Sequence, residues 1–255
     1  MAGDFVWFDL NTPTPAQSRD FYAAVMGWGI EVWEQADYTM FAASDGSTVG
    51  GIQALADEAV AGGASAHWLP YITVDDCDAA AVRGVELGGT LLLPPQDIPT
   101  VGRFSVLADP SGVPVAPFVP EGDMSPITPA PVGHSAWHDL ASTDMDAAVA
   151  FYCGLFGWEI VHEMDMGMGT YRIFGTPGHP RGLGGFLPPA VDPKWATAPH
   201  WKIYTRVADL SVASHAVTDL GGRVVQGPLE VPGGDHVVLC IDPQGAPFAL
   251  HHHAD

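Results

Sequence analysis

The chain has 255 residues, 47% of them hydrophobic, and a formal net charge of −21 at pH 7. At roughly 100 to 150 residues per domain, this length predicts two compact units, and the apolar fraction excludes global disorder. The acidic charge repels nucleic acid and anionic membranes, so we expect neither as a partner and attribute the charge to a solvated surface.

The beginning of the chain predicts a strand followed by a helix. Phe5 to Asn11 is the expected strand. Thr14 and Pro15 open the helix, because Thr can accept a bond from a first-turn amide and Pro suits the first helical position. Gly27 can adopt the left-handed conformation that ends it. Short runs typical of strands follow at Ile30–Trp33 and Tyr38–Ala42.

The same order of elements returns further along the chain. A strand over Leu69 to Val74 precedes Asp75 and Asp76, either of which can cap a helix that Gly88 ends. Three more strands are expected at Thr90–Leu93, Phe104–Leu107 and Val113–Phe118. The last two are joined by Asp109-Pro110-Ser111-Gly112, which is typical of a type I turn.

The second half of the chain repeats the first. Matching residues are at first 130 positions apart, as in Trp7 and Trp137, and later 133 apart, as in His67 and His200. One three-residue insertion between Trp158 and His200 explains the change. The loop-like sequences in that interval are Gly178–Arg181 and Pro188–Pro189.

A proline-rich stretch separates the two repeats. It runs from Pro120 to Pro131 and predicts a stiff, extended linker. We therefore expect one domain over residues 1–120, a linker over 121–132 and a second domain over 133–255. Each domain is expected to contain two units of strand, helix and three strands.

The order and spacing of several motifs resemble the vicinal-oxygen-chelate superfamily of glyoxalases, bleomycin-resistance proteins and extradiol dioxygenases. The motifs are the Phe-Tyr and Gly-Trp pairs, the helix entries after Val74 and Val207, and the Asp-Pro-x-Gly hairpins, each found in both repeats. The chain resembles tandem glyoxalase-like proteins of actinobacteria, some of which are named hydroxylases. The resemblance implies an α+β fold of two tandem domains, in which paired βαβββ units form curved mixed sheets around a small-molecule cavity.

The resemblance also locates the positions at which metal-using members hold their metal. In the two repeats these positions fall on Trp7 and Trp137, Leu69 and Lys202, and Ala116 and Ala249, with the fourth near Gln53 or Leu187. None of the side chains in the first three pairs is a usual ligand of a divalent metal, because the Lys nitrogen is protonated and the Trp nitrogen is only a hydrogen-bond donor. We therefore expect no metal cofactor, and no mechanism that depends on a Lewis acid.

Alternation along a strand indicates which other residues share the face of these positions. We assign catalytic roles to Asp139, Tyr204 and Lys202 in the second repeat, with Asp9 and Tyr71 as first-repeat counterparts. A carboxylate in an aromatic pocket can act as a general acid or base, and Tyr or Lys can stabilise an oxyanion. Alternatively, both Asp residues hydrogen-bond backbone or Arg groups, or Asp139 and Lys202 neutralise each other.

The expected ligand-binding residues lie on the same face or near its mouth. They are Trp7, Trp137, Phe118, Arg103, His236, Arg206 and His251. The two Trp can stack on a planar aromatic ligand, and Arg103 can bind a carboxylate or phenolate or else form a surface salt bridge. His138 has the opposite parity and is expected in the core. His251 and His253 can share one face, either as metal ligands or in a solvated tail.

Two classes of function remain open. The first is a metal-independent enzyme acting on an aromatic or carbonyl-bearing metabolite, and the second is a protein that sequesters a drug or metabolite between aromatic walls. A metal site rebuilt from Asp139, His236 and His251 is a third possibility. The expected partner is a small organic molecule, bound by a monomer with internal domain pairing or by a homodimer.

Cysteine usage and the absence of targeting signals bear on location. Cys77, Cys153 and Cys240 are far apart in the sequence, which favours neither a disulfide framework nor a structural zinc site. No stretch approaches the roughly 18 apolar residues that span a bilayer, and no signal peptide is recognisable. We expect a cytoplasmic protein.

Overall fold

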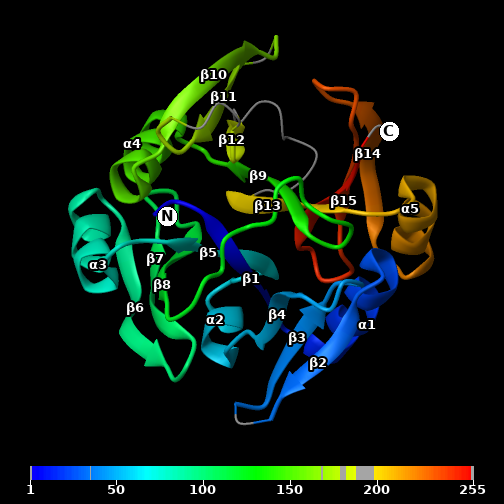
Figure 1. Ribbon diagram of the computed structural model, residues 1–255, viewed down its shortest axis with the longest axis horizontal. Helices are drawn as coiled ribbons and strands as arrows, with labels where there is room; N and C mark the ends of the chain where they lie inside the picture. The colour runs from blue at the N-terminus through cyan, green and yellow to red at the C-terminus, as the bar shows by residue number, and fades with distance from the viewer. Residues whose placement is uncertain (1, 35, 168, 179–181, 188–197, 254–255) are drawn as a thin grey trace. The chain divides into compact units, whose positions relative to one another are not determined.

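A computed structural model describes residues 2–34, 36–167, 169–178, 182–187 and 198–253 (Figure 1). The first repeat contains β1 (Phe5–Thr12), α1 (Pro15–Met26), β2 (Gly29–Trp33), β3 (Tyr38–Ala42), β4 (Thr48–Ala54), α2 (Asp57–Ala61), β5 (His67–Thr73), α3 (Cys77–Glu86), β6 (Thr90–Ile98), β7 (Gly102–Ala108) and β8 (Pro114–Pro120). Apart from the short α2, this is twice the expected order of strand, helix and three strands.

The second repeat has the same order. It contains β9 (Ser135–Ala141), α4 (Met145–Phe156), β10 (Glu159–Asp165), β11 (Thr170–Gly175), β12 (Gly184–Leu187), β13 (His200–Arg206), α5 (Leu210–Asp219), β14 (Arg223–Glu230), β15 (His236–Ile241) and β16 (Pro247–His252). Four βαβββ rounds are therefore confirmed. No helix within the described ranges is both long enough and apolar enough to cross a membrane.

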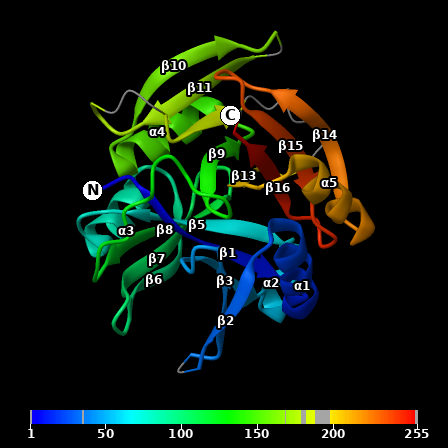
Figure 2. The same cartoon turned by 45° about the vertical axis from the view of Figure 1, so that its right-hand side comes forward.

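The strands form two mixed sheets of eight strands each. Their orders are β2-β3-β4-β1-β5-β8-β7-β6 and β10-β11-β12-β9-β13-β16-β15-β14. Neighbours along the outer parts are antiparallel, whereas β1 with β4 and β5 with β8 are parallel, as are β9 with β12 and β13 with β16. Figure 2 shows β14, β15 and β16 running side by side next to α5. The predicted α+β class is confirmed.

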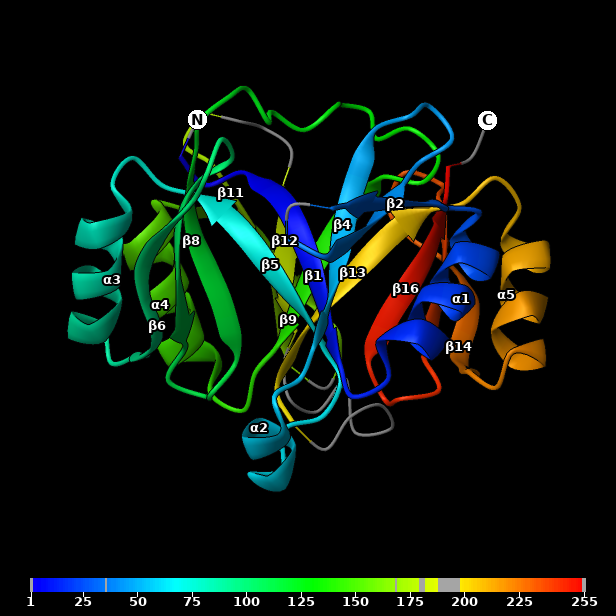
Figure 3. The same ribbon diagram turned by 90° about the horizontal axis from the view of Figure 1, so that it is seen from below.

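Each of the two compact units of the chain draws on both repeats. Unit 1 consists of Met1–Trp7, Leu69–Pro126 and His138–Trp201, and unit 2 of Phe8–Trp68, Ile127–Trp137 and Lys202–Asp255. Within unit 1, helices α3 and α4 lie next to each other, and within unit 2, α1 and α5 do so (Figure 3). The division into units thus cuts across the repeat, and the domain limits expected from the repeat stay a prediction.

Equivalent contacts between a tyrosine and an aspartate join the two repeats inside each unit. In unit 2 the Trp68 indole donates to the hydroxyl of Tyr22 at 3.3 Å, and this hydroxyl donates to Asp242 at 3.3 Å. In unit 1 Trp201 donates to the Tyr152 hydroxyl at 3.2 Å, and this hydroxyl lies beside Asp109, whose buried Oδ2 atom is without a hydrogen-bond partner. A helix tyrosine of one repeat therefore meets the hairpin aspartate of the other in both units.

The predicted turns and caps are largely confirmed. The amide of Gly112 donates to the Asp109 carbonyl at 2.9 Å, which closes the expected turn between β7 and β8. Asp76 caps α3 by accepting from the Ala79 amide, and Gly27 ends α1 at φ 70°. The cap assigned to Thr14 is wrong: its backbone, at φ −131° and ψ 70°, lies outside the extended region of a capping residue, and its hydroxyl bonds no helix amide.

Candidate functional site

An apolar cluster in unit 1 contains five positions singled out from the sequence. Leu69 and Tyr71 on β5 pack with Ala116 and Phe118 on β8, and Trp7 lies against them half-buried. Parallel pairing places Tyr71 opposite Ala116. The expected parity along β5 and β8 is therefore confirmed in this unit.

The cluster in unit 1 is largely aromatic. The Tyr71 ring lies 5.9 Å from Phe118 in an edge-on arrangement and 5.7 Å from Phe104, which is half-buried. Rings at these separations attract one another beyond simple burial of their area. The half-buried rings of Trp7 and Phe104 leave apolar surface at the margin of the cluster.

The matching cluster in unit 2 is smaller and has polar neighbours. Tyr204 on β13 packs with Val237 and Ala249, and Trp137 lies against them. Pairing of Tyr204 with Ala249 reproduces the register of the first repeat. Alternation along β13 places Lys202, which is only 2% exposed, on the same face as Tyr204.

The two repeats differ at equivalent positions. Lys202 stands 133 residues after Leu69, and His251 stands 133 residues after Phe118. The first repeat therefore presents aliphatic and aromatic side chains where the second presents a cation and an imidazole. At these positions the second repeat is the more polar of the two.

Both aspartates of the predicted site accept a hydrogen bond from a tyrosine. Asp9 and Asp139 are each 3% exposed. The Tyr38 hydroxyl donates to Oδ1 of Asp9, and the Tyr171 hydroxyl donates to Oδ1 of Asp139 at 2.7 Å. Each aspartate thus accepts a described hydrogen bond from a phenol, which lies on β3 in the first repeat and on β11 in the second. The sequence had suggested backbone or Arg groups as the alternative partners.

Sequence reasoning missed these two tyrosines. The available signal was the spacing, because Tyr38 and Tyr171 are 133 residues apart. Their equivalence places the three-residue insertion between Trp158 and Tyr171, at the β10–β11 hairpin. The expected interval is correct, but the insertion precedes Gly178. Residues 179–181 and 188–189 of the suggested loops lie outside the described residues.

Glycines make room for both tyrosine rings. Gly51 pairs with Asp9 across β1 and β4, and Gly185 pairs with Asp139 across β9 and β12. A Cβ atom on Gly51 would lie 1.8 Å from the hydroxyl oxygen of Tyr38. A Cβ atom on Gly185 would lie 2.1 Å from the Tyr171 ring. Any side chain at either glycine therefore displaces the tyrosine.

The predicted cationic ligand-binding residues have protein partners. Arg103 forms ion pairs of 2.8 Å with Asp78 and with Asp97, which corresponds to the surface salt bridge considered as its alternative. Arg206 donates to the Ala130 carbonyl at 2.8 Å. His236 begins β15. A ligand-binding role for these residues stays a prediction.

Two histidines near the end of the chain share one carboxylate. His251 and His253 contact opposite oxygens of Asp235, at 2.9 Å and 2.7 Å, so they lie on one face as expected. Burial lowers the pKa of His251, although Asp235 opposes the change. His138, in contrast, is a core residue: it stacks 3.8 Å from Phe5, bonds the Leu183 carbonyl, and burial lowers its pKa to about 4.

The residues at the family's metal positions do not fit a metal. Trp7, Leu69 and Ala116 carry no metal-binding atom and are packed in the apolar cluster of unit 1. In unit 2, Trp137 and Ala249 are equally unsuited. Within the described ranges, no group of three or more His, Cys, Asp or Glu side chains is arranged to hold a metal ion.

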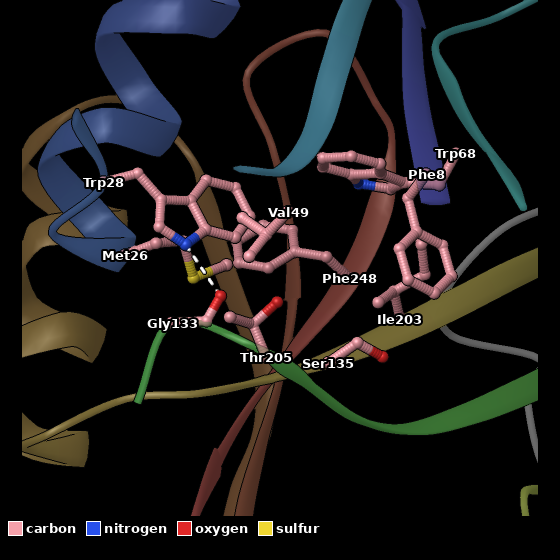
Figure 4. Close-up of a pocket in the computed structure, with 10 residues that line it drawn as sticks. All are labelled: Phe8, Met26, Trp28, Val49, Trp68, Gly133, Ser135, Ile203, Thr205 and Phe248. Carbon is pink, nitrogen blue, oxygen red and sulfur yellow. Dashed lines mark hydrogen bonds between the residues drawn. The ribbon is translucent and has the colours of Figure 1, made fainter. Parts of the chain in front are cut away.

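A small enclosed pocket in unit 2 belongs to the core (Figure 4). Its volume is about 10 Å³, which is room for no more than one water molecule. Figure 4 shows Phe8, Trp28, Trp68 and Phe248 around it and the bond from the Trp28 indole to the Gly133 carbonyl, which is 2.8 Å long. None of its lining residues is a predicted site residue, so the pocket reflects packing of aromatic rings.

Residues 4–116 and 132–250 each match the Glyoxalase/Bleomycin resistance protein/Dioxygenase superfamily. The chain belongs to this superfamily. Among curated relatives, it is 30% identical over 272 residues to the anthracycline biosynthesis protein DauV of Streptomyces sp. strain C5, covering 96% of this chain and 91% of DauV. It is 29% identical over 249 residues to the provisionally named glyoxylase CFP32 of Mycobacterium tuberculosis, covering 96% and 92%.

A solved structure of the superfamily has the same fold. The Mn(II)-bound glyoxalase of Novosphingobium aromaticivorans aligns with a TM-score of 0.69 at 15% identity, over 100% of this chain and 83% of that one. At this identity the likeness establishes the architecture and leaves the chemistry to be argued from the residues.

Proposed function

We propose that the protein is a metal-independent enzyme that acts on a polycyclic aromatic or carbonyl-bearing metabolite. The buried Asp139 carboxylate, bonded to a phenol in a chain whose family metal positions hold Trp, Leu, Lys and Ala, is the observation that carries this proposal. The relatedness to DauV, whose name places it in anthracycline biosynthesis, supports an aromatic substrate. Aromatic side chains at Trp7, Tyr71 and Phe118 support the same substrate class.

The proposed chemical step is a proton transfer to Asp139. As a general base, its carboxylate takes a proton from a C–H group next to a carbonyl or from a phenolic O–H. The electron pair of the broken bond stays on the substrate as an enolate or phenolate, and the new O–H bond forms on Asp139. Stabilisation of that oxyanion by Lys202 and Tyr204 stays a prediction from the sequence.

A second candidate function is sequestration of an aromatic compound. The unit 1 cluster favours it, because Trp7, Phe104 and Tyr71 supply ring surfaces and the equivalent of Lys202 is Leu69. In this function the ligand is bound unchanged, and removing the ring of Trp7 weakens binding.

The test combines binding, turnover and metal analysis. The full chain is incubated with 1,4-dihydroxyanthraquinone and with aromatic 2-oxoaldehydes, binding is followed by quenching of tryptophan fluorescence, and products are separated by chromatography. Conversion that survives EDTA and falls at least tenfold in Asp139→Asn supports the enzyme. Binding without conversion, weakened in Trp7→Ala, supports sequestration. Stoichiometric metal, with loss of conversion in EDTA, refutes the metal-independent proposal.

A further inference from the structure

Each repeat holds an aspartate, a tyrosine and a glycine in the same arrangement. The tyrosine hydroxyl donates to the buried aspartate, and the glycine is the partner of that aspartate in the neighbouring parallel strand. The members are Asp9, Tyr38 and Gly51 in the first repeat and Asp139, Tyr171 and Gly185 in the second. Within each set the members depend on one another for space and for bonding.

The glycine and the tyrosine together determine where the carboxylate points. The ring of Tyr171, which is 8% exposed, occupies the space that a side chain on Gly185 would fill. Its hydroxyl meets Oδ1 of Asp139 at 2.7 Å. The terminal torsion of an aspartate is broad when nothing holds it, so a fixed donor on one oxygen restricts the direction of the other.

We propose that Tyr171 and Gly185 are positioning residues that orient Asp139 toward its ligand; this inference rests on the proposed function and deepens it. In the first repeat, Tyr38 and Gly51 orient Asp9 in the same way. The second-repeat set is the one tested, because Asp139 is the general base of the proposed function and lies in unit 1 together with Tyr171 and Gly185.

The experiment is a double-mutant cycle in the full chain. Tyr171→Phe and Asp139→Asn are made singly and together, and kcat, KM and Kd are measured for 1,4-dihydroxyanthraquinone. Tyr171→Phe is expected to lower kcat about tenfold with KM within about twofold, and to have no further effect in the Asp139→Asn background. If the probe is bound but not converted, the same cycle applies to Kd. Gly185→Ala, which displaces the ring, is expected to reproduce the loss.

A structural control separates positioning from folding. Tyr152→Phe removes another buried phenol of unit 1, so it is expected to lower the unfolding temperature by a similar amount while kcat and Kd stay near wild type. An equal loss for Tyr171→Phe in both backgrounds overturns the inference, as does a larger loss for Tyr38→Phe than for Tyr171→Phe. If Asp139→Asn has no effect on conversion or binding, the proposed role of Asp139 fails first.

Discussion

Replacing Asp242 by Asn tests the hydrogen-bond chain of unit 2 through the pH dependence of stability. Asp242 is 3% exposed, and burial is the main cause that raises the pKa of its carboxyl from 3.8 to about 6. Its Oδ1 accepts from the amides of Gln244 at 2.9 Å and Ala246 at 2.7 Å, and an Asn oxygen can accept both bonds. The substitution therefore removes the titration and keeps the turn.

The raised pKa of Asp242 determines whether the free energy of unfolding rises or falls with pH. Between pH 3.8 and about 6 the folded chain holds the Asp242 proton while the unfolded chain releases it, so the free energy of unfolding falls as pH rises. A shift of about two units at 1.36 kcal/mol per unit costs about 3 kcal/mol above pH 6. Asn avoids this cost but deprives the Tyr22 hydroxyl of its acceptor, at about 1 kcal/mol.

We therefore expect Asp242→Asn to be about 2 kcal/mol more stable than wild type at pH 8 and about 1 kcal/mol less stable near pH 4. Urea unfolding followed by near-UV circular dichroism at several pH values measures the difference, in which the other titrating groups cancel. Asp109→Asn, the equivalent change in unit 1, is expected to act in the same direction because burial also raises the pKa of Asp109. A difference between Asp242→Asn and wild type that does not vary with pH would refute the reasoning.

Three further predictions use other parts of the structure. The thiols of half-buried Cys153 and buried Cys240, whose pKa burial raises to about 11 and about 12, should react with a maleimide at neutral pH much more slowly in the native chain than after unfolding; rapid labelling of native Cys240 would contradict this prediction. Residues 1–126 expressed alone should not be a stable monomer, because Tyr22 and Asp109 lose the partners Asp242 and Tyr152; light scattering that shows a folded monomer would contradict this. Gly51→Ala should destabilise the chain by about 2 kcal/mol or more, because the added Cβ atom meets the Tyr38 ring. Gly46→Ala should destabilise it by about 1 kcal/mol, because the Cβ atom meets nothing there and only the positive φ of 85° is strained. Similar losses for the two variants in urea unfolding would argue against the Tyr38 ring above Gly51.

Much of the fold could be predicted because its determinants are local. Gly27 ends α1, Asp76 caps α3 and Asp109 closes the β7–β8 turn through interactions with residues at most a few positions away. Alternation along β5 and β8 correctly places Tyr71 with Leu69 and Phe118 with Ala116, because successive side chains of a strand point to opposite faces. The Thr14 cap failed, because the Thr14 backbone at φ −131° and ψ 70° lies outside the extended region of a capping residue.

The repeat was determined by the sequence itself, since residue identity and spacing suffice to recognise it. The residue types of Trp7, Leu69 and Ala116 likewise show without a structure that these side chains are not metal ligands. The tertiary structure decided how Asp9 and Asp139 are held. Tyr38 is 29 residues from Asp9 and reaches it only because β3 and β1 flank β4 with a glycine between them. It also decided that each compact unit takes one βαβββ round from each repeat, because long-range packing of buried helices and hairpins leaves no mark in local sequence patterns.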